Sequence, residues 1–209
     1  MKAIVLYSGG RDSSLVAHLL DHFGYEVKLI TANAGIVKNS WKTAAKAGKI
    51  LGFKHEVLKI SREIIKRAAE IAEEDGFPLH AVNYAHKQVL EVIAQKYRKK
   101  FPTIADGTRR DDRTPKLTYQ EMQSLEDRYG IAYFAPLLGF GHKTINHLSK
   151  QIFNYKEIYA GSQPTAEYET EIRAVLRKME KGLDKKIFPK KHFHSVITGW
   201  RKEYKPRCA

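Results

Sequence analysis

Hydrophobic residues along the first 140 positions follow two alternating patterns. Short continuous apolar runs, bounded by glycine or polar residues, predict buried strands at 2–7, 27–32, 55–60, 103–106 and 131–137. Between these runs, apolar residues recur three or four positions apart, which predicts amphipathic helices. The helices are expected from Leu15 to a stop at Gly24, and at 40–51, 62–75, 84–99 and 117–129. The alternation predicts an α/β fold with a mostly parallel sheet.

The chain beyond residue 141 has a different pattern. Helical spacing continues from His142 and includes 166–182, whereas the stretch from Lys185 onward is basic and aromatic without a clear period. Neither a repeat nor a low-complexity linker separates the two parts. We therefore expect a main domain at 1–150 and a helical, basic C-terminal extension at 151–209 that packs on it.

The bulk composition indicates a globular protein that attracts anions. With 43% hydrophobic and 11% aromatic residues among 209, the chain can form a sizeable core. The net charge of +14 attracts polyanions such as RNA, and nucleotides too, although a heat-adapted surface rich in lysine and glutamate would also explain it. No apolar run reaches the length of a membrane span, and Met1 leads directly into the first strand. A cytoplasmic protein without a leader is therefore expected.

A loop of small and polar residues joins the first predicted strand to the first predicted helix. Its glycines allow backbone conformations closed to other residues and let the main chain approach a ligand closely. Backbone N–H groups at the helix start, aided by the helix dipole, favour an anion there, and serine hydroxyls add donors. The loop consists of Ser8, Gly9, Gly10, Arg11, Asp12, Ser13 and Ser14.

Asp12 is the residue of this loop that indicates which ligand the loop would bind. A carboxylate repels a bare phosphate, but it is suited to hold Mg²⁺ between itself and phosphates. An ordinary turn followed by a helix cap explains the local sequence equally well. The loop lacks the Gly-Lys-Ser/Thr of a Walker A motif and the Gly-x-Gly-x-x-Gly dinucleotide pattern, which argues against γ-phosphate chemistry and against NAD.

The sequence SGGRDSS, directly after the first strand, resembles the signature of the PP-loop ATP pyrophosphatases, the adenine nucleotide alpha-hydrolase superfamily. The similarity covers residues 2–154 in the right order. It implies a doubly wound parallel five-stranded sheet with a C-terminal helical extension, and a nucleotide-binding domain at 1–150. It also implies that the loop holds the pyrophosphate part of ATP.

A second segment, at 105–112, is similar to the Gly-Thr-x-x-Asp-Asp stretch of this family. In the family, an acidic residue after the Gly-Thr helps to hold magnesium on the pyrophosphate. The matching residues here are Gly107, Thr108, Asp111 and Asp112. Taken alone, this segment is explained more simply as a solvated charged turn. Together with the loop at 8–14, a magnesium-binding site is the favoured interpretation.

A third segment, at 136–143, resembles the Pro-Leu…Lys stretch that ends a late strand and opens a helix. The resemblance implies that Lys143 neutralises the phosphates during bond cleavage. A lysine at a helix start is otherwise unfavourable with the helix dipole, and an anionic ligand would explain its position. Ile145 stands where the family usually has glutamate. Main-chain groups at Thr31 and Asn33 would read the adenine, although an acidic residue is common at the latter position.

The chemistry that this resemblance implies uses ATP and Mg²⁺. An acceptor oxygen attacks the α-phosphorus in line and pyrophosphate leaves, which needs mainly positioning and charge neutralisation. Asp12, with Asp111 or Asp112, would hold the metal, and Asp12 and Lys143 would be catalytic. The acceptor stays open between a tRNA base and a small carbonyl or carboxylate metabolite. Because Cys208 is the only cysteine, sulfur transfer is disfavoured.

Two other functions stay open, a non-catalytic adenine-nucleotide sensor or partner protein and an RNA-binding protein driven by charge. A homodimer is also left open. The aromatic and basic residues of the tail fit RNA stacking, but core packing explains the aromatics at least as well.

Several titratable residues outside these segments favour structural interpretations. His192 and His194 have a spacing that can bind metal on a strand, but an exposed or RNA-facing segment is preferred. His80 and His86 are expected at the surface or as helix caps. The glutamates Glu167, Glu169 and Glu171 lie two positions apart, so we expect them to spread around a helix and not to share one face.

Overall fold

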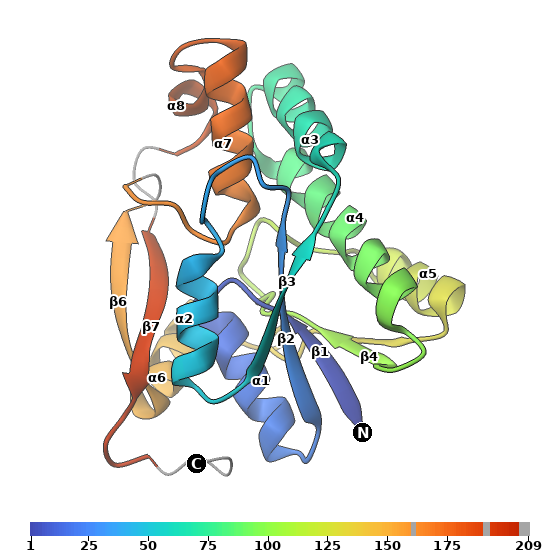
Figure 1. Ribbon diagram of the computed structural model, residues 1–209, viewed down its shortest axis with the longest axis vertical. Coiled ribbons are helices and arrows are strands. Elements are labelled where there is room, and N and C mark those ends of the chain that lie inside the picture. Colours follow the sequence, from blue (N-terminus) through green and yellow to red (C-terminus); the bar gives the residue numbers. More distant parts are fainter. Residues whose placement is uncertain (160–161, 190–192, 205–209) are drawn as a thin grey trace.

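The computed structural model of the chain describes residues 1–159, 162–189 and 193–204. Strands and helices alternate through the main part of the chain (Figure 1). Their order is β1 (Lys2–Leu6), α1 (Arg11–His22), β2 (Glu26–Asn33), α2 (Lys42–Ile50), β3 (Lys54–Lys59), α3 (Arg62–Asp75), α4 (Leu79–Tyr97), β4 (Thr103–Ala105), α5 (Tyr119–Tyr129), β5 (Ala132–Phe134) and α6 (His142–Ile152).

The strands form one parallel sheet in the order β3-β2-β1-β4-β5, which confirms the predicted five-stranded α/β fold. Both faces of the sheet are covered, because neighbouring residues of β1 pack into different cores. Ile4 packs with residues of α3, α4 and α5, whereas Ala3 and Val5 pack with residues of α1, α2 and α6. Burial on both faces explains why these strands are continuous apolar runs in the sequence.

Local capping explains where several helices begin and end. The Ser61 side chain accepts a hydrogen bond from the backbone at the start of α3, and Thr118 forms a capping box with Glu121 at the start of α5. Both helices end at a glycine with positive φ. Three boundary predictions are wrong. α1 begins at Arg11 and not at Leu15, α4 begins at Leu79, directly after Pro78, and not at residue 84, and β5 ends at Phe134 and not at residue 137.

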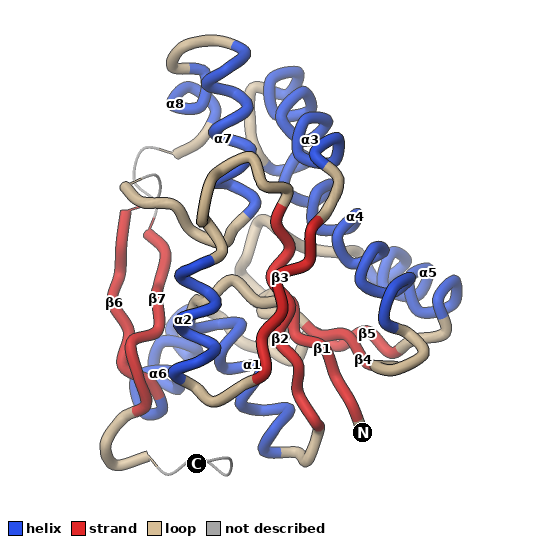
Figure 2. The backbone as a smooth tube through the Cα atoms, in the orientation of Figure 1, coloured by secondary structure: helices blue, strands red, loops and turns tan. Residues whose placement is uncertain are grey.

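The C-terminal extension is not purely helical, which corrects that expectation. It contains β6 (Phe153–Tyr159), α7 (Tyr168–Met179), α8 (Leu183–Ile187) and β7 (Phe193–Trp200). β6 and β7 pair as an antiparallel two-stranded ribbon, which runs beside α2 and α6 (Figure 2). The ribbon was hard to recognise in the sequence because most of its residues are exposed or half-buried, so few apolar positions mark its period.

The extension shares both cores of the main part. Ile172, Leu176 and Phe188 belong to the core that α3 and α4 cover, while Phe153 and Ile197 belong to the core on the other face. Of the tail aromatics, Phe188 is buried and Phe193 is exposed. Within the described residues, no helix combines the length and apolar character that a bilayer crossing requires.

Candidate functional site

The loops that follow β1 and β4 meet at the edge of the sheet where the strands end. These strands are neighbours, yet the chain continues from β1 to β2 on one side and from β4 to β5 on the other, which makes this a topological switch point. A Cβ atom on Gly107 would lie 2.9 Å from the Ser13 backbone nitrogen, so the two loops are in close contact. A cavity of about 780 Å³ opens beside them.

The N-terminus of α1 faces this cavity without a side-chain cap from its own N-cap residue, Gly10. The backbone N–H of Arg11 donates instead to the Ser195 hydroxyl of β7, over 3.0 Å. Ser195 thus accepts one of the N–H groups for which the start of α1 has no intrahelical partner. Sequence reasoning missed Ser195, since a lone serine 184 positions away carries no local signal.

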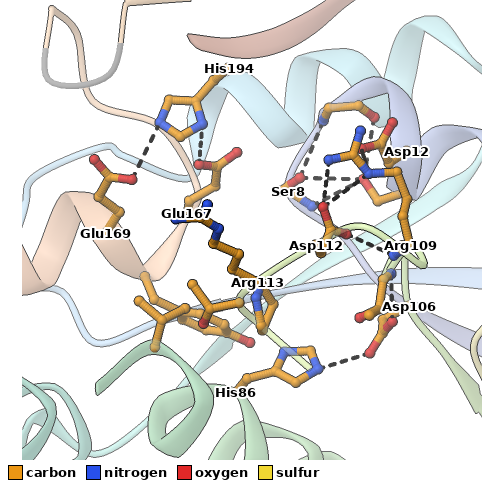
Figure 3. A pocket seen from close by; sticks show the side chains of 18 of the residues that line it. Ser8, Asp12, His86, Asp106, Arg109, Asp112, Arg113, Glu167, Glu169 and His194 are labelled. Atoms are coloured by element: carbon orange, nitrogen blue, oxygen red, sulfur yellow. Dashed lines mark hydrogen bonds and ion pairs between the residues drawn. The ribbon is translucent and has the colours of Figure 1, made fainter. Parts of the chain in front are cut away.

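Arg109 joins the acidic residues of the two loops. Its Nε lies 3.4 Å from a carboxylate oxygen of Asp12, and its Nε and Nη2 contact Asp112 at 3.0 and 2.5 Å (Figure 3). Its Nη1 is buried and has no hydrogen-bond partner among the described residues. A buried guanidinium N–H without an acceptor is costly, and Arg109 is one of the residues that line the cavity.

Asp12 lies between two cations, since Nε of Arg11 is 3.1 Å from its other carboxylate oxygen. Burial raises the pKa of Asp12 above its ordinary value, although the two arginines oppose this effect. Removal from water is what destabilises the charged carboxylate here. A divalent cation would restore a favourable environment for that charge, because Mg²⁺ prefers carboxylate oxygens.

The other acidic residues of the second loop each have a partner besides Arg109, whose Nε is 3.9 Å from Asp111. Asp111 accepts the backbone N–H of His142 over 2.7 Å and so caps the start of α6, and this hydrogen bond lowers the pKa of Asp111. Asp112 also accepts the backbone N–H of Arg109 over 2.7 Å. Asp112 therefore lies close to Asp12 through their shared arginine, while Asp111 is directed toward α6.

A buried hydrogen-bond network centred on Asp106 supports the loop that follows β4. Asp106 accepts hydrogen bonds from His86 over 2.8 Å, from the Tyr133 hydroxyl over 2.5 Å and from the Thr108 backbone over 2.9 Å. Burial opposes its ionisation, but the attraction of His86 and the three hydrogen bonds outweigh it and lower the pKa of Asp106 to about 2. The prediction that His86 is a surface or capping residue is wrong, because His86 is only 2% exposed. His80 is exposed, as predicted, and pairs with Asp75.

The structure gathers most of the predicted site residues around one cavity. Those that line it are Ser8, Gly10, Arg11, Asp12, Ser13, Gly107, Thr108, Asp111 and Asp112. Four others support it from outside: Gly9 packs against α2, and Ser14, Thr31 and Asn33 are buried and hydrogen-bonded to Tyr7 or Ser40. Ala32, between the last two, does line the cavity.

Lys143 is placed differently from the other predicted residues. It is the second residue of α6 and is exposed, and the cavity lining includes its neighbour His142 but not Lys143 itself. The described cations nearest to the loop carboxylates are Arg11 and Arg109. The role of Lys143 therefore stays a prediction.

The glutamates of the extension do not spread around one helix as expected. Glu167 is the N-cap of α7 and has an extended backbone, so the helical spacing does not apply to it. Glu167 and Glu169 both line the cavity, together with His194 of β7. Glu171 points elsewhere and accepts backbone N–H groups of Ala34 and Ile36, each over 2.8 Å. The expectation that His194 is exposed is also wrong, because the residue is buried, with only 8% of its surface exposed. His192 lies outside the described residues.

Comparison with known proteins identifies relatives over the whole chain. A model of a family of unknown function (DUF7411) matches residues 1–199. The uncharacterized protein MJ0690 of Methanocaldococcus jannaschii is 45% identical over 203 residues, which span 97% of this chain and 98% of that protein. A crystal structure of a predicted subunit of tRNA methyltransferase from Methanocaldococcus jannaschii has a TM-score of 0.88 and 44% identity, and covers 98% of this chain and 100% of that chain.

A further relative matches over part of the chain. The tRNA-specific 2-thiouridylase MnmA of Wolbachia pipientis subsp. Culex pipiens is 37% identical over 102 residues. The match spans 47% of this chain and 24% of that enzyme. The shared part is therefore a fraction of the thiouridylase.

Proposed function

This chain belongs to DUF7411, a family of unknown function, and we propose that it is a PP-loop enzyme that cleaves ATP to AMP and pyrophosphate. The reaction would transfer the adenylyl group to an acceptor. The observation that carries the proposal is the convergence of the N-terminus of α1, the Arg109 guanidinium and the Asp12 and Asp112 carboxylates on one cavity. The partial likeness to an enzyme named as a tRNA thiouridylase supports it.

The phosphates would lie at the start of α1. The backbone N–H groups of the first turn favour negative charge, and the hydroxyls of Ser8 and Ser13, which also line the cavity, add donors. The Nη1 of Arg109 supplies a further donor, which the described residues leave without a partner. These groups would hold the leaving pyrophosphate and stabilise the charge that develops on it.

The donor set also suits Mg²⁺. Asp12 and Asp112 already share one cationic partner, so their carboxylates are close enough to approach a common cation. Both would hold the metal, which supplies charge neutralisation at the phosphates when bound. Arg109 would then pair with phosphate oxygens, because its guanidinium fits such oxygens in bidentate fashion.

A tRNA is our preferred acceptor class. The net charge of +14 attracts a polyanion. Two exposed aromatic rings, Tyr159 and Phe193, lie with centroids 4.3 Å apart at the end of the ribbon, and Phe193 also lines the cavity. Aromatic rings of this kind can stack on unpaired bases. A small metabolite would not need them.

Labelled ATP tests the proposal directly. Protein, Mg²⁺ and unfractionated tRNA are incubated with α-labelled ATP, and pyrophosphate is measured separately. Label is expected in adenylated tRNA and in AMP displaced from it, together in an amount equal to the pyrophosphate released. Asp12→Asn should lower the rate at least a hundredfold, which is the order of effect for a lost catalytic electrostatic partner. The matched control is Asp127→Asn, since Asp127 is exposed on α5 away from the cavity.

Other outcomes of these experiments distinguish the proposed enzyme from the alternative functions. ADP as the product would contradict the proposal. Binding of ATP without turnover, equal in wild type and Asp12→Asn, would favour the nucleotide sensor. Salt-sensitive binding of tRNA that does not respond to ATP would favour the RNA-binding protein.

A further inference from the structure

Two carboxylates and an imidazole meet on the wall of the cavity that the C-terminal extension builds. Glu167 and Glu169 come from the start of α7, and His194 comes from β7 (Figure 3). One ligand atom from each of the three lies within 4.8 Å of the other two. Nδ1 of His194 contacts Glu167, and its Nε2 lies 3.9 Å from Glu169. In Figure 3 this group is separate from the one formed by Asp12, Arg109 and Asp112.

The fold brings these residues together in a way that holds them in place. The extended backbone of Glu167 lets its side chain share a side with Glu169, which regular helical spacing would not allow. Arg173 donates to one oxygen of Glu169 over 2.6 Å and also stacks on the Phe188 ring at 4.4 Å. This contact orients the Glu169 carboxylate and leaves its other oxygen toward His194. A supporting residue that orients a ligand carboxylate is typical of metal sites.

We propose that Glu167, Glu169 and His194 form a second divalent-cation site, of the zinc class. Imidazole nitrogen together with carboxylate oxygens suits zinc and its neighbours, whereas Mg²⁺ prefers oxygen ligands alone. Ligand atoms around tetrahedral zinc lie roughly 3–3.5 Å apart, as follows from bonds of about 2 Å. Because one cation takes only one ring nitrogen of His194, the ring or a glutamate side chain would turn to bring the three ligand atoms from within 4.8 Å to that spacing.

The remaining coordination positions of such a cation would open into the cavity. All three ligands line it, and a site with three protein ligands and an open position is the arrangement of a catalytic or substrate-binding metal. The cation would bind a hydroxyl, amine or water of a second substrate opposite the loop at 8–14. Metal binding itself is independent of ATP, and only this use of the metal rests on the proposed function.

Metal titration of the full chain without nucleotide tests the inference. Chelator-treated protein is titrated with Zn²⁺ against a chromophoric indicator, and wild type should bind one equivalent at low micromolar metal. His194→Asn and Glu169→Gln should each weaken this binding at least tenfold. Glutamine keeps an oxygen acceptor for Arg173, so Glu169→Gln removes the ligand charge with little change in packing.

Three controls make the outcome specific. His80→Asn removes an exposed histidine that also pairs with a carboxylate, at 2.8 Å from Asp75, and should leave the binding unchanged. Cys208→Ser should do the same. Asp12→Asn should also keep the site, so that failure of the ATP chemistry and failure of this inference are distinguishable.

A spectroscopic measurement on wild type alone covers the case in which a variant does not fold. Co²⁺ bound by nitrogen and oxygen ligands should show visible ligand-field bands without a thiolate charge-transfer band. The inference is overturned if wild type binds less than one equivalent, if His80→Asn loses as much affinity as His194→Asn, or if the thiolate band appears. Glu167, Glu169 and His194 would then form only an ion-pair cluster.

Discussion

Replacing Gly9 with alanine tests how tightly the loop at 8–14 is packed against α2. Gly9 has a φ of +81°, a conformation that L side chains rarely adopt, and a Cβ atom there would lie 2.7 Å from the Cα of Ala44. Gly52 provides a matched control. It has the same φ of +81° and no atom within 4 Å of its virtual Cβ. The two substitutions therefore share the backbone strain and differ in the steric contact.

The expected losses of unfolding free energy follow from the backbone strain and the steric contact. A left-handed conformation costs a non-glycine residue roughly 1–2 kcal/mol, so Gly52→Ala should lower the free energy of unfolding by about that amount. An added methyl group in a packed interior costs a further 1–3 kcal/mol or so, because main chain must move. Gly9→Ala should thus lower the free energy of unfolding by roughly 2–5 kcal/mol. The backbone atoms of Ala44 cannot yield as a flexible side chain would.

Urea unfolding of both variants and wild type gives the free energies. The expected result is a difference of about 1–3 kcal/mol between the two variants, with equal slopes against urea concentration. Gly9→Ala should also weaken ATP binding, since the loop moves away from α2. Equal destabilisation of both variants would refute the close packing of loop and helix.

Three further substitutions probe the surroundings of the cavity. Asp106→Asn removes a carboxylate whose pKa is held at about 2, below its ordinary value of 3.8, so wild type should be more stable by about 2 kcal/mol near neutral pH. This difference in stability is present above pH 4 and should fade as the pH falls from about 4 toward 2. Unfolding free energies measured across that range test it, and a difference independent of pH would contradict the lowered pKa of Asp106. Glu171→Gln should cost about 1–3 kcal/mol in thermal or urea unfolding, because one amide oxygen cannot replace a carboxylate that accepts three backbone N–H groups; an unchanged unfolding free energy would contradict this. Lys143→Ala should lower pyrophosphate release at least tenfold while the unfolding free energy stays within about 0.5 kcal/mol, since Lys143 is exposed; an unchanged rate would remove Lys143 from the catalytic residues.

Much of the α/β core was readable from local patterns. β1 and β2 are buried on both faces, so each appears in the sequence as a run of apolar residues with a polar or glycine boundary. The loop at 8–14 was equally visible, because glycines and serines between a strand and a helix are a local signal. The β6–β7 ribbon was missed, since most of its side chains are partly or fully exposed and its period is weak.

The composition of the cavity depended on tertiary structure. Asp12 and Arg109 meet because β1 and β4 are neighbours, an order that no short segment specifies. Ser195 reaches α1, and His194 reaches Glu167, only after the ribbon has docked on the core. Backbone propensity and hydrophobic spacing act over a few residues and therefore mark strands, helices and turns along the chain. Which side chains from distant segments share a cavity is decided by burial of the whole core, because that free energy is gained only when the packed layers form together.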